Sequence, residues 1–591
     1  MSKKIFKLLS LVIVATMVLG MMGCGPAATT AAPAPATQAP AVPVLVPTSA
    51  PPTAAPATAA PAAPDPYGPY AKTIVMTTVR KFDTTQKLPE GDTPENNQYT
   101  RYVKDTLNID TQHLWTVANA DYDQKVNLAI ASNDLPDAMV VNLAQFTTLV
   151  KNDQIADLTD TYTQYVSPRV KQMMDSSKGI ALKAVTFNGK IMGIPSLTVP
   201  DDDYQLMWIR KDWLDKLGLA VPKTMDDIEA VAKAFVTKDP GGNGAGKTIG
   251  IAGQQNGALI TTNFLAPNNL DFGFDAVFSA YHAYPGYWIK DASGQAVYGS
   301  IQPEAKTALV ELAKLYQEGL IDHEMGVRKD ASAPVAAGQV GIYFGEWWSG
   351  YWPLPDAIKN NPKANWQAYA VPLDAQGVWN PRGATPATTF VVVRKGYEHP
   401  EAAMKIVNLF NRDESKMDLT KGDQANEVLR LPQAMYDEGE TTYKALMAVL
   451  AGSAKATDYA DPKYDVYKLL KADAVNVTKV KIAPIDNMDI QYWTPAADMG
   501  AWSRMYSILD GDGAIYNPIG GKDKVNRVFS LIYAPTPLIT DKWVNLKKLE
   551  DETFLKIILG TASIDTFDQF VKDWKAQGGD AVTAEVQAAV K

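Results

Sequence analysis

The densest group of aromatic side chains in the chain lies at 345–353, which reads Gly-Glu-Trp-Trp-Ser-Gly-Tyr-Trp-Pro. One glutamate, three tryptophans and a tyrosine follow one another closely: Glu346, Trp347, Trp348, Tyr351 and Trp352. Flat aromatic rings stack on the apolar C–H faces of sugars, and a carboxylate accepts hydrogen bonds from the surrounding hydroxyl groups. These five residues are therefore candidate ligand contacts for a carbohydrate. The alternative is that the rings pack a core between two lobes.

The two tryptophans follow a predicted strand directly, and adjacent side chains of an extended segment point to opposite sides. We therefore expect one ring to face a ligand and the other to pack beneath it. A second aromatic group is expected at the rim of the same site, with a core position as its alternative: Tyr281, His282, Tyr284 and Trp288.

Further polar groups are candidates for the same site. The run Asp201-Asp202-Asp203 lies shortly before Met207, and Asp203 is its best candidate, because one carboxylate can accept hydrogen bonds from two sugar hydroxyls. Asn142 ends an apolar run, and the carboxyl ends of strands face the binding crevice in open α/β sheets. The alternatives are a solvated acidic turn for the aspartates and a turn-capping role for Asn142.

The only cysteine follows a pattern typical of an export signal. Two lysines at 3–4 precede the largely apolar residues 5–20, a stretch too short and too close to the start for a typical membrane-spanning helix. A glycine stands directly before Cys24, as signal peptidase II requires. We expect a signal peptide over 1–23 and lipidation at Cys24, where two or three acyl chains anchor stably to a membrane. The alternative is an ordinary signal peptide with an incidental cysteine.

Composition excludes several other classes of site. Once Cys24 is acylated, no thiol remains for disulfides, nucleophilic catalysis or cysteine-bound zinc. The four histidines are scattered singly, without the spacing of a transition-metal site: His113, His282, His323 and His399. The formal net charge of -9 argues against nucleic acid as a partner. We expect no cofactor, no metal and no catalytic residue.

Two changes of composition divide the chain. Residues 24–66 hold the lipidated cysteine and a stretch rich in Ala, Pro and Thr, which cannot bury enough apolar area to fold and is predicted to be an extended tether. The globular part after it exceeds what one hydrophobic core usually supports, so two lobes are expected.

Apolar runs in the globular part alternate between strand-like and helix-like periods. This alternation predicts an α/β fold with a largely parallel sheet. Strands are expected at 73–79, 113–117, 137–142, 340–344 and 388–393, and helices at 95–107, 122–130, 160–174, 224–237, 303–318 and 401–411.

Several ordered landmarks resemble the family 1 extracellular solute-binding proteins of ABC importers, especially their large lipoprotein branch. They begin with Tyr122-Asp-Gln-Lys-Val-Asn-Leu and continue through Gly189-Lys-Ile-Met-Gly-Ile-Pro, Met207-Trp-Ile-Arg-Lys-Asp-Trp and Gly345-Glu-Trp-Trp to Phe567-Asp-Gln-Phe-Val. The resemblance covers the chain from about residue 72 to its end. It implies a type II periplasmic-binding-protein-like fold, with a hinge between two lobes and a ligand cleft at their interface.

On this resemblance the chain crosses between lobes near 196–203 and again near 383–388. The resulting map gives lobe 1 as 70–196 and about 384–420, and lobe 2 as 197–383. The helix-rich remainder at 421–591 is assigned to neither lobe.

The glycine-rich loop 239–248 matches two motifs imperfectly. It fits the phosphate-binding pattern Gly-x-x-x-x-Gly-Lys-Thr, but a helix precedes it and a strand comes after it, which is the reverse of the order that a phosphate loop needs. The resembled branch often carries a calcium-type loop at this place. In this chain, Gly241 and Lys247 stand where that loop has acidic residues. We predict no nucleotide site, and whether the altered loop keeps any ion binding stays open.

These observations favour a monomeric solute-binding protein on the outer side of the cell membrane, which captures a small ligand and passes it to an ABC transporter permease. A carbohydrate or oligosaccharide is the expected ligand, although uronic acids and peptides also fit. Two alternatives stay open: a secreted carbohydrate-active enzyme, such as a glycoside hydrolase or lyase, and a ligand-presenting partner of a membrane sensor.

Overall fold

The computed structural model describes most of the globular part of the chain. The described residues are 64–82, 88–118, 121–199, 201, 204–254, 259–261, 264–265, 271–383, 387–418, 426–479, 499–533 and 535–590. The predicted signal peptide, Cys24, nearly all of the tether and the candidate Asp203 therefore lie outside the described residues.

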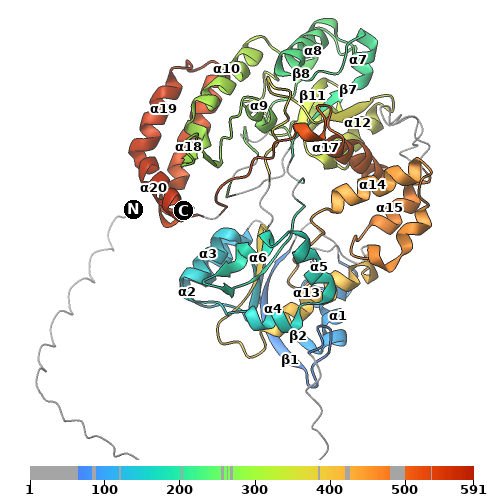
Figure 1. Ribbon diagram of the computed structural model, residues 1–591, viewed down its shortest axis with the longest axis vertical. Coiled ribbons are helices and arrows are strands. Elements are labelled where there is room, and N and C mark those ends of the chain that lie inside the picture. The colour runs from blue at the N-terminus through green and yellow to red at the C-terminus, as the bar shows by residue number, and fades with distance from the viewer. Residues whose placement is uncertain are drawn as a thin grey trace, which may run out of the picture. The chain divides into compact units, whose positions relative to one another are not determined.

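The fold is α/β and two-lobed, as the sequence predicted (Figure 1). Each lobe is built around hydrophobic cores of its own. Two cores, from Met76 to Val466 and from Val79 to Val392, define lobe 1. A single larger core that starts at Tyr204 and ends at Val586 defines lobe 2. The lobe boundaries predicted from the sequence stay predictions.

Lobe 1 contains strands β1 (Ile74–Phe82), β2 (Ile109–Ala118), β3 (Ala138–Asn142), β4 (Thr186–Phe187), β5 (Lys190–Ile191), β6 (Ile194–Pro195) and β13 (Thr389–Val393), and helices α1 (Gln98–Leu107), α2 (Tyr122–Ser132), α3 (Leu143–Lys151), α4 (Thr159–Tyr165), α5 (Pro168–Ser176), α6 (Ile180–Val185) and α13 (Glu401–Asp413).

Lobe 2 contains strands β7 (Leu206–Arg210), β8 (Ile249–Ile251), β9 (Trp288–Lys290), β10 (Ala296–Tyr298), β11 (Val340–Gly345) and β12 (Trp366–Tyr369), and helices α7 (Lys211–Leu217), α8 (Met225–Lys238), α9 (Asp275–Ala280), α10 (Pro303–Gln317), α11 (Ser332–Ala336), α12 (Leu354–Asn360), α14 (Glu438–Leu450), α15 (Leu470–Val477), α16 (Met499–Tyr506), α17 (Gly513–Tyr516), α18 (Pro537–Ile558), α19 (Thr566–Trp574) and α20 (Asp580–Ala589). Two short helical turns, η3 (Trp347–Gly350) and the π-helical η10 (Ser507–Asp512), pack on each other.

The expectation of a largely parallel sheet is wrong. In the lobe 2 sheet, ordered β12-β7-β11-β8, the central strand β7 is antiparallel to both of its neighbours. In lobe 1, β13 lies between β3 and β6 and is antiparallel to both. Strand β13 reaches that sheet from a distant part of the chain, so its direction is not fixed by the local strand–helix–strand connection that enforces parallel pairing. Only β1–β2 and β8–β11 are parallel among the described pairs of strands.

The single helix expected over 160–174 is two helices. The chain breaks between α4 and α5, where Ser167 adopts an extended conformation and its hydroxyl accepts a hydrogen bond from the Val170 N–H at 3.2 Å. Pro168 occupies the first position of α5, because a proline there needs no hydrogen-bonding partner and disfavours helical geometry in the residue before it. The other predicted helices and strands are present, with ends shifted by a few residues.

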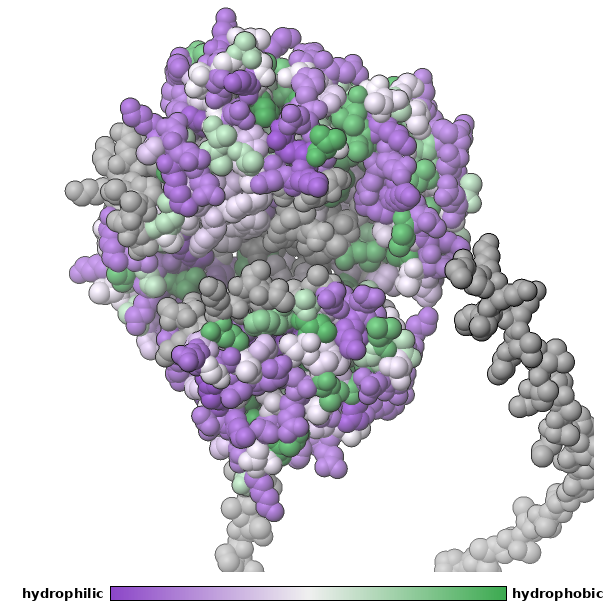
Figure 2. Space-filling model, turned by 180° about the vertical axis from the view of Figure 1, so that it is seen from behind, coloured by the Kyte–Doolittle hydropathy of each residue, from purple (hydrophilic) through white to green (hydrophobic). Residues whose placement is uncertain are grey.

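Hydrophilic residues cover much of the face shown in Figure 2, and hydrophobic residues there form small separate patches. Among the described residues, no helix combines the length and the apolar character needed to cross a membrane.

Candidate ligand-binding site

The aromatic loop, which we define as residues 346–352, leaves the end of β11 and turns at once into η3. Trp347 and Trp348 therefore stand on a helical turn rather than on the extended segment expected. Successive side chains on such a turn still point in different directions. Both rings are half-buried, but only Trp347 packs against the lobe 2 core. In the described part of the chain, Trp348 does not pack against any of the three cores, so it is the better candidate for stacking on a ligand.

Buried polar groups fix the backbone of this loop. The carboxylate of Asp271 accepts a hydrogen bond from the Glu346 N–H at 2.8 Å, and the indole N–H of Trp208 donates to the Glu346 carbonyl at 3.1 Å. The Ser349 hydroxyl donates to the same carbonyl at 2.8 Å. Burial raises the pKa of Asp271 to about 8, against the opposing effect of the hydrogen bond from the Glu346 N–H. Buried groups therefore hold the backbone at the start of the loop.

A glycine on η10 completes the support of the loop. A Cβ atom on Gly511 would lie 2.2 Å from the Trp347 carbonyl oxygen, so no larger residue fits there without moving the loop. Gly511 lies in the π-helical turn η10, and its missing Cβ lets the two backbones approach closely. This contact joins the aromatic loop to a segment far along the chain.

The other predicted members of the loop differ in exposure. Glu346 is completely buried, so the structure places its carboxylate behind the loop rather than on its surface. Trp352 packs edge-on against Phe272, with ring centroids 5.6 Å apart, and has a core-like role. Tyr351 is 46% exposed and lies beside Arg504, whose guanidinium opposes the rise that burial causes in the pKa of Tyr351.

Near the first predicted crossing, the structure assembles a polar cluster that the sequence did not predict. Asp201 is buried, and one of its carboxylate oxygens lies 3.6 Å from Nε of Arg527. The guanidinium of Arg527 also lies over the ring of Tyr204, at 5.9 Å from its centroid. Tyr436 is close enough for the charges of Asp201 and Arg527 to act on its hydroxyl. In the sequence, only the acidic run at 201–203 indicated this cluster, because Arg527 comes from a distant segment.

Asn142 follows the alternative interpretation, a helix cap. Its side-chain oxygen accepts a hydrogen bond from the Gln145 N–H at 3.0 Å, and the Gln145 side chain accepts from the Asn142 N–H at 3.1 Å. This reciprocal capping box begins α3. The side-chain oxygen of Asn142 is thus engaged with the backbone, although the residue remains half-buried at the strand end.

The rim position expected for the second aromatic group is wrong for two of its members. Trp288 and Tyr284 are buried in lobe 2, and Trp288 packs against Tyr298 with ring centroids 5.2 Å apart. Trp288 lies on the hairpin of β9 and β10, and β10 packs against the C-terminal helix α20. Exposed His282 lies 3.2 Å from the Asp374 carboxylate.

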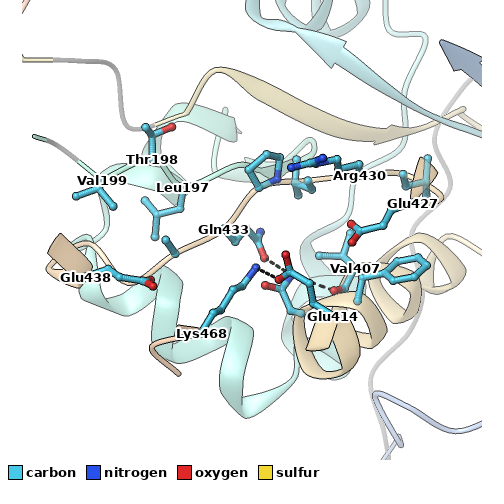
Figure 3. A pocket seen from close by; sticks show the side chains of 16 residues that line it. Leu197, Thr198, Val199, Val407, Glu414, Glu427, Arg430, Gln433, Glu438 and Lys468 are labelled. Atoms are coloured by element: carbon cyan, nitrogen blue, oxygen red, sulfur yellow. Dashed lines mark hydrogen bonds and ion pairs between the residues drawn. The ribbon is translucent and has the colours of Figure 1, made fainter. Parts of the chain in front are cut away.

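A cavity of about 230 Å³ lies beside the first predicted crossing, and we name it the Asn411 pocket (Figure 3). Its walls come from the segment 197–199, the C-terminal part of α13 with Glu414, the segment 427–434, Glu438 and Lys468. Apolar side chains and polar groups alternate around it, and Lys468 forms an ion pair with Glu414 across one end. No local pattern in the sequence indicates this pocket, because its walls come from separate segments.

The acidic group of the loop 239–248 is engaged in hydrogen bonds within the loop, and whether the loop binds an ion stays open. The carboxylate of Asp239 already accepts hydrogen bonds from the N–H groups of Asn243 and Gly244, each at 2.9 Å. The hydroxyl of Thr248 donates to it as well, and these bonds hold the pKa of Asp239 below its usual range. Calcium needs six or more oxygen ligands, several of them charged. In the described part of the chain, no group of three or more His, Cys, Asp or Glu side chains is placed to hold a metal.

Comparison with known proteins gives relatives along most of the chain. The fructooligosaccharide ABC transporter substrate-binding protein FusA of Streptococcus pneumoniae is 28% identical over 284 residues, which are 45% of this chain and 49% of FusA. The polygalacturonan/rhamnogalacturonan-binding protein YtcQ of Bacillus subtilis is 22% identical over 511 residues, which are 84% of this chain and 89% of YtcQ. The chain thus spans about half the length of FusA and most of YtcQ.

Solved structures support the fold. An HMO-binding, ABC-transporter-associated solute-binding protein from Bifidobacterium longum infantis superposes with a TM-score of 0.58 at 17% identity, covering 88% of this chain and 98% of that one. The alginate-binding protein AlgQ2, solved without calcium ion, gives a TM-score of 0.54 at 17% identity, covering 89% of this chain and 100% of that one. At this identity the likeness concerns the fold alone.

A model of one protein family matches residues 98–426, which include lobe 1 strands, the lobe 2 sheet and the aromatic loop. The match extends over more than half of the chain, and the ordered landmarks in the sequence lead to the same family. The chain belongs to the bacterial extracellular solute-binding proteins.

Proposed function

We propose that this protein captures a carbohydrate, specifically an oligosaccharide, outside the cell and delivers it to the permease of an ABC importer. The names of FusA and YtcQ describe carbohydrate-binding proteins, and FusA is a substrate-binding protein of an ABC transporter. This chain adds its own support through a preformed aromatic surface and a separate cluster of polar groups.

The observation that carries the proposal is the state of Trp348. Its ring is half-buried on a loop whose backbone is held by Asp271, Trp208 and Ser349, yet it packs against none of the cores that the described residues form. A rigid, partly exposed indole offers a large contact area at a low cost in conformational entropy. Asp201 and Arg527 supply the charged and hydrogen-bonding groups that orient sugar hydroxyls elsewhere in the site.

Capture would involve closure of the two lobes on the ligand, since bound groups contact both lobes only in the closed state. Lobe 1 and lobe 2 have separate cores, which allows each to move as a unit. The protein would act as a monomer, because a single chain supplies both lobes.

A screen of neutral and uronic-acid oligosaccharides by thermal shift tests the function. A ligand at a hundred times its dissociation constant should stabilise the protein by about 2.7 kcal/mol. Product analysis of the same mixtures separates binding from catalysis, because a receptor returns the oligosaccharide intact and a glycoside hydrolase or lyase shortens it. If no oligosaccharide stabilises the protein, or if the chains are cleaved, the proposal is wrong.

The proposal includes a lipid anchor at Cys24, which would keep the protein at the outer face of the cell membrane. Cys24→Ala should abolish acylation and move the protein from the membrane fraction to the soluble or secreted fraction. Ser10→Ala, in the same leader but away from the cysteine, is the matched control and should fractionate like the wild type. Membrane retention of the Cys24→Ala variant after a carbonate wash would contradict the anchor.

A further inference from the structure

The Asn411 pocket lies where the chain passes between the lobe cores. Leu197 belongs to a lobe 1 core, and Tyr204, a few residues later, belongs to the lobe 2 core. The neighbouring wall makes a second passage, because Met435 packs in lobe 1 and Tyr443 packs in lobe 2. A backbone hydrogen bond joins the two passages, from the Leu197 N–H to the Pro432 carbonyl at 3.0 Å.

One buried polar atom in the pocket wall, the side-chain oxygen of Asn411, lacks a hydrogen-bond donor among the described residues. Asn411 is only 6% exposed, and its amide N–H groups donate to the Val407 carbonyl at 3.0 Å and to the side-chain oxygen of Gln433 at 2.9 Å. Gln433 is in turn fixed by donating to the Pro195 carbonyl at 2.9 Å. This chain of bonds orients the Asn411 amide, and its side-chain oxygen has no donor among the described residues. A buried acceptor without a donor is costly, which points to a hydroxyl or other donor from a bound molecule.

The remaining walls define what that molecule would be. Leu197, Phe410 and Leu431 supply apolar surface, and Glu438 supplies a carboxyl group near Lys468. Burial raises the pKa of Glu438, so this carboxyl can be protonated more readily than usual and can then donate as well as accept. A volume of about 230 Å³ is below the roughly 300–1,000 Å³ of pockets for drug-sized ligands, so a single small ring is the appropriate size.

The pocket is also connected to the aromatic loop. Arg504, which forms an ion pair with Asp473 at 2.8 Å, acts electrostatically on Tyr351 of the aromatic loop and on Glu438 of the pocket. The positive charge of Arg504 therefore acts on a group in each of the two places.

We propose that the Asn411 pocket is a subsite for one neutral monosaccharide unit at the end of the captured oligosaccharide, with the Asn411 side-chain oxygen accepting a hydrogen bond from a sugar hydroxyl. The subsite rests on the proposed function, and it places the end of the ligand against both passages between the lobes. A ligand in this pocket would thus contact the segments that must move when the lobes close.

Two variants test the subsite, with the oligosaccharide that gives the largest thermal shift in the screen as the probe. Asn411→Leu removes the acceptor, and Ala434→Phe fills the pocket from another wall. Each should weaken binding roughly tenfold in titration calorimetry, as expected when one buried hydrogen bond and its contacts are lost. Asn152→Leu, which changes an exposed asparagine of lobe 1 away from the pocket, is the matched control and should bind like the wild type.

Hydrogen exchange on the wild-type protein gives a readout that does not depend on how the variants fold. Binding of the same probe should slow exchange in 407–414 and 427–438 as well as in the aromatic loop. If the probe binds but protects only the aromatic loop, or if both folded variants keep wild-type affinity, the pocket holds only water and the subsite is wrong. If no oligosaccharide binds the wild type at all, the proposed function fails before the subsite is tested.

Discussion

The two aromatic groups of lobe 2 have similar compositions and opposite environments. Around Tyr284 and Trp288 the rings are buried, whereas Trp348 and Tyr351 of the aromatic loop retain exposed surface. The difference lies in the elements that cover each group. Trp288 begins a hairpin strand that other elements cover, while Trp348 stands on a turn at the end of a central strand. Aromatic density therefore locates two candidates, and only the covering elements decide between them.

The same contrast separates two kinds of support. Trp288 is held by neighbouring rings, including Phe264 and Tyr298. The aromatic loop is held instead by hydrogen bonds to its backbone, above all from Asp271 and Trp208. Backbone anchoring leaves the side chains of the loop available to a ligand.

The largest expected effect is on the buried group. Trp288→Ala should destabilise the fold by about 3–5 kcal/mol, because it leaves a cavity in the lobe 2 core. Chemical denaturation measures this loss, and affinity for the oligosaccharide should be retained in the fraction that stays folded. A variant as stable as the wild type would show that Trp288 does not support the core.

A smaller effect concerns the anchor of the aromatic loop. The pKa of Asp271 is raised to about 8 in the folded protein, well above its value in the unfolded chain. The folded state therefore holds a proton that the unfolded state releases, and stability falls as pH rises toward 8, by at most about 1.4 kcal/mol per pH unit. Asp271→Asn keeps an acceptor for the Glu346 N–H but cannot ionise. Its stability should therefore fall less than that of the wild type between about pH 5 and pH 8, a window that lies between the two pKa values.

Denaturation of both proteins across that pH range supplies the measurement. The difference in unfolding free energy between wild type and variant removes the contributions of all other titrating groups. Parallel curves would contradict the assignment of a protonated Asp271 beneath the loop.

The smallest expected effect concerns one tyrosine hydroxyl in each aromatic group. Here the loss of the more exposed hydroxyl should cost more stability than the loss of the buried one. The Tyr284 hydroxyl is buried without a hydrogen-bonding partner among the described residues, so Tyr284→Phe should change stability by no more than about 0.5 kcal/mol. The more exposed Tyr351 hydroxyl lies beside Arg504, and Tyr351→Phe should cost about 1 kcal/mol. Thermal melts of the two variants make the comparison, and a larger loss for Tyr284→Phe would contradict it.

The sequence predicted local structure better than the way distant segments meet. Helix α10 and strand β11 follow strong apolar periods and a helix-starting proline, so their limits could be predicted closely. The direction of β13 could not, because it depends on where the chain returns to lobe 1. Ser167 shows a third case, because it caps α5 beside Pro168 inside a stretch that the apolar period alone assigns to a single helix.

In the candidate site, too, features formed by neighbouring residues could be predicted and contacts between distant segments could not. The aromatic loop was visible as a cluster of neighbouring residues, although its helical turn and the burial of Glu346 were not. The pairing of Asp201 with Arg527 and the walls of the Asn411 pocket join segments that carry no common sequence signal. Such contacts result from tertiary packing, and local periodicity does not contain that information.

Titration calorimetry of Trp348→Ala with an oligosaccharide that binds the wild type tests whether the Trp348 ring is a ligand contact. The variant should lose about 2–4 kcal/mol of binding free energy, the usual size for an aromatic anchor, while its melting temperature stays close to that of the wild type. Trp348→Phe, which keeps a flat ring, should retain most of the affinity. Full affinity in Trp348→Ala would contradict the proposed role of Trp348, because the ligand would then bind without the ring that the aromatic loop presents.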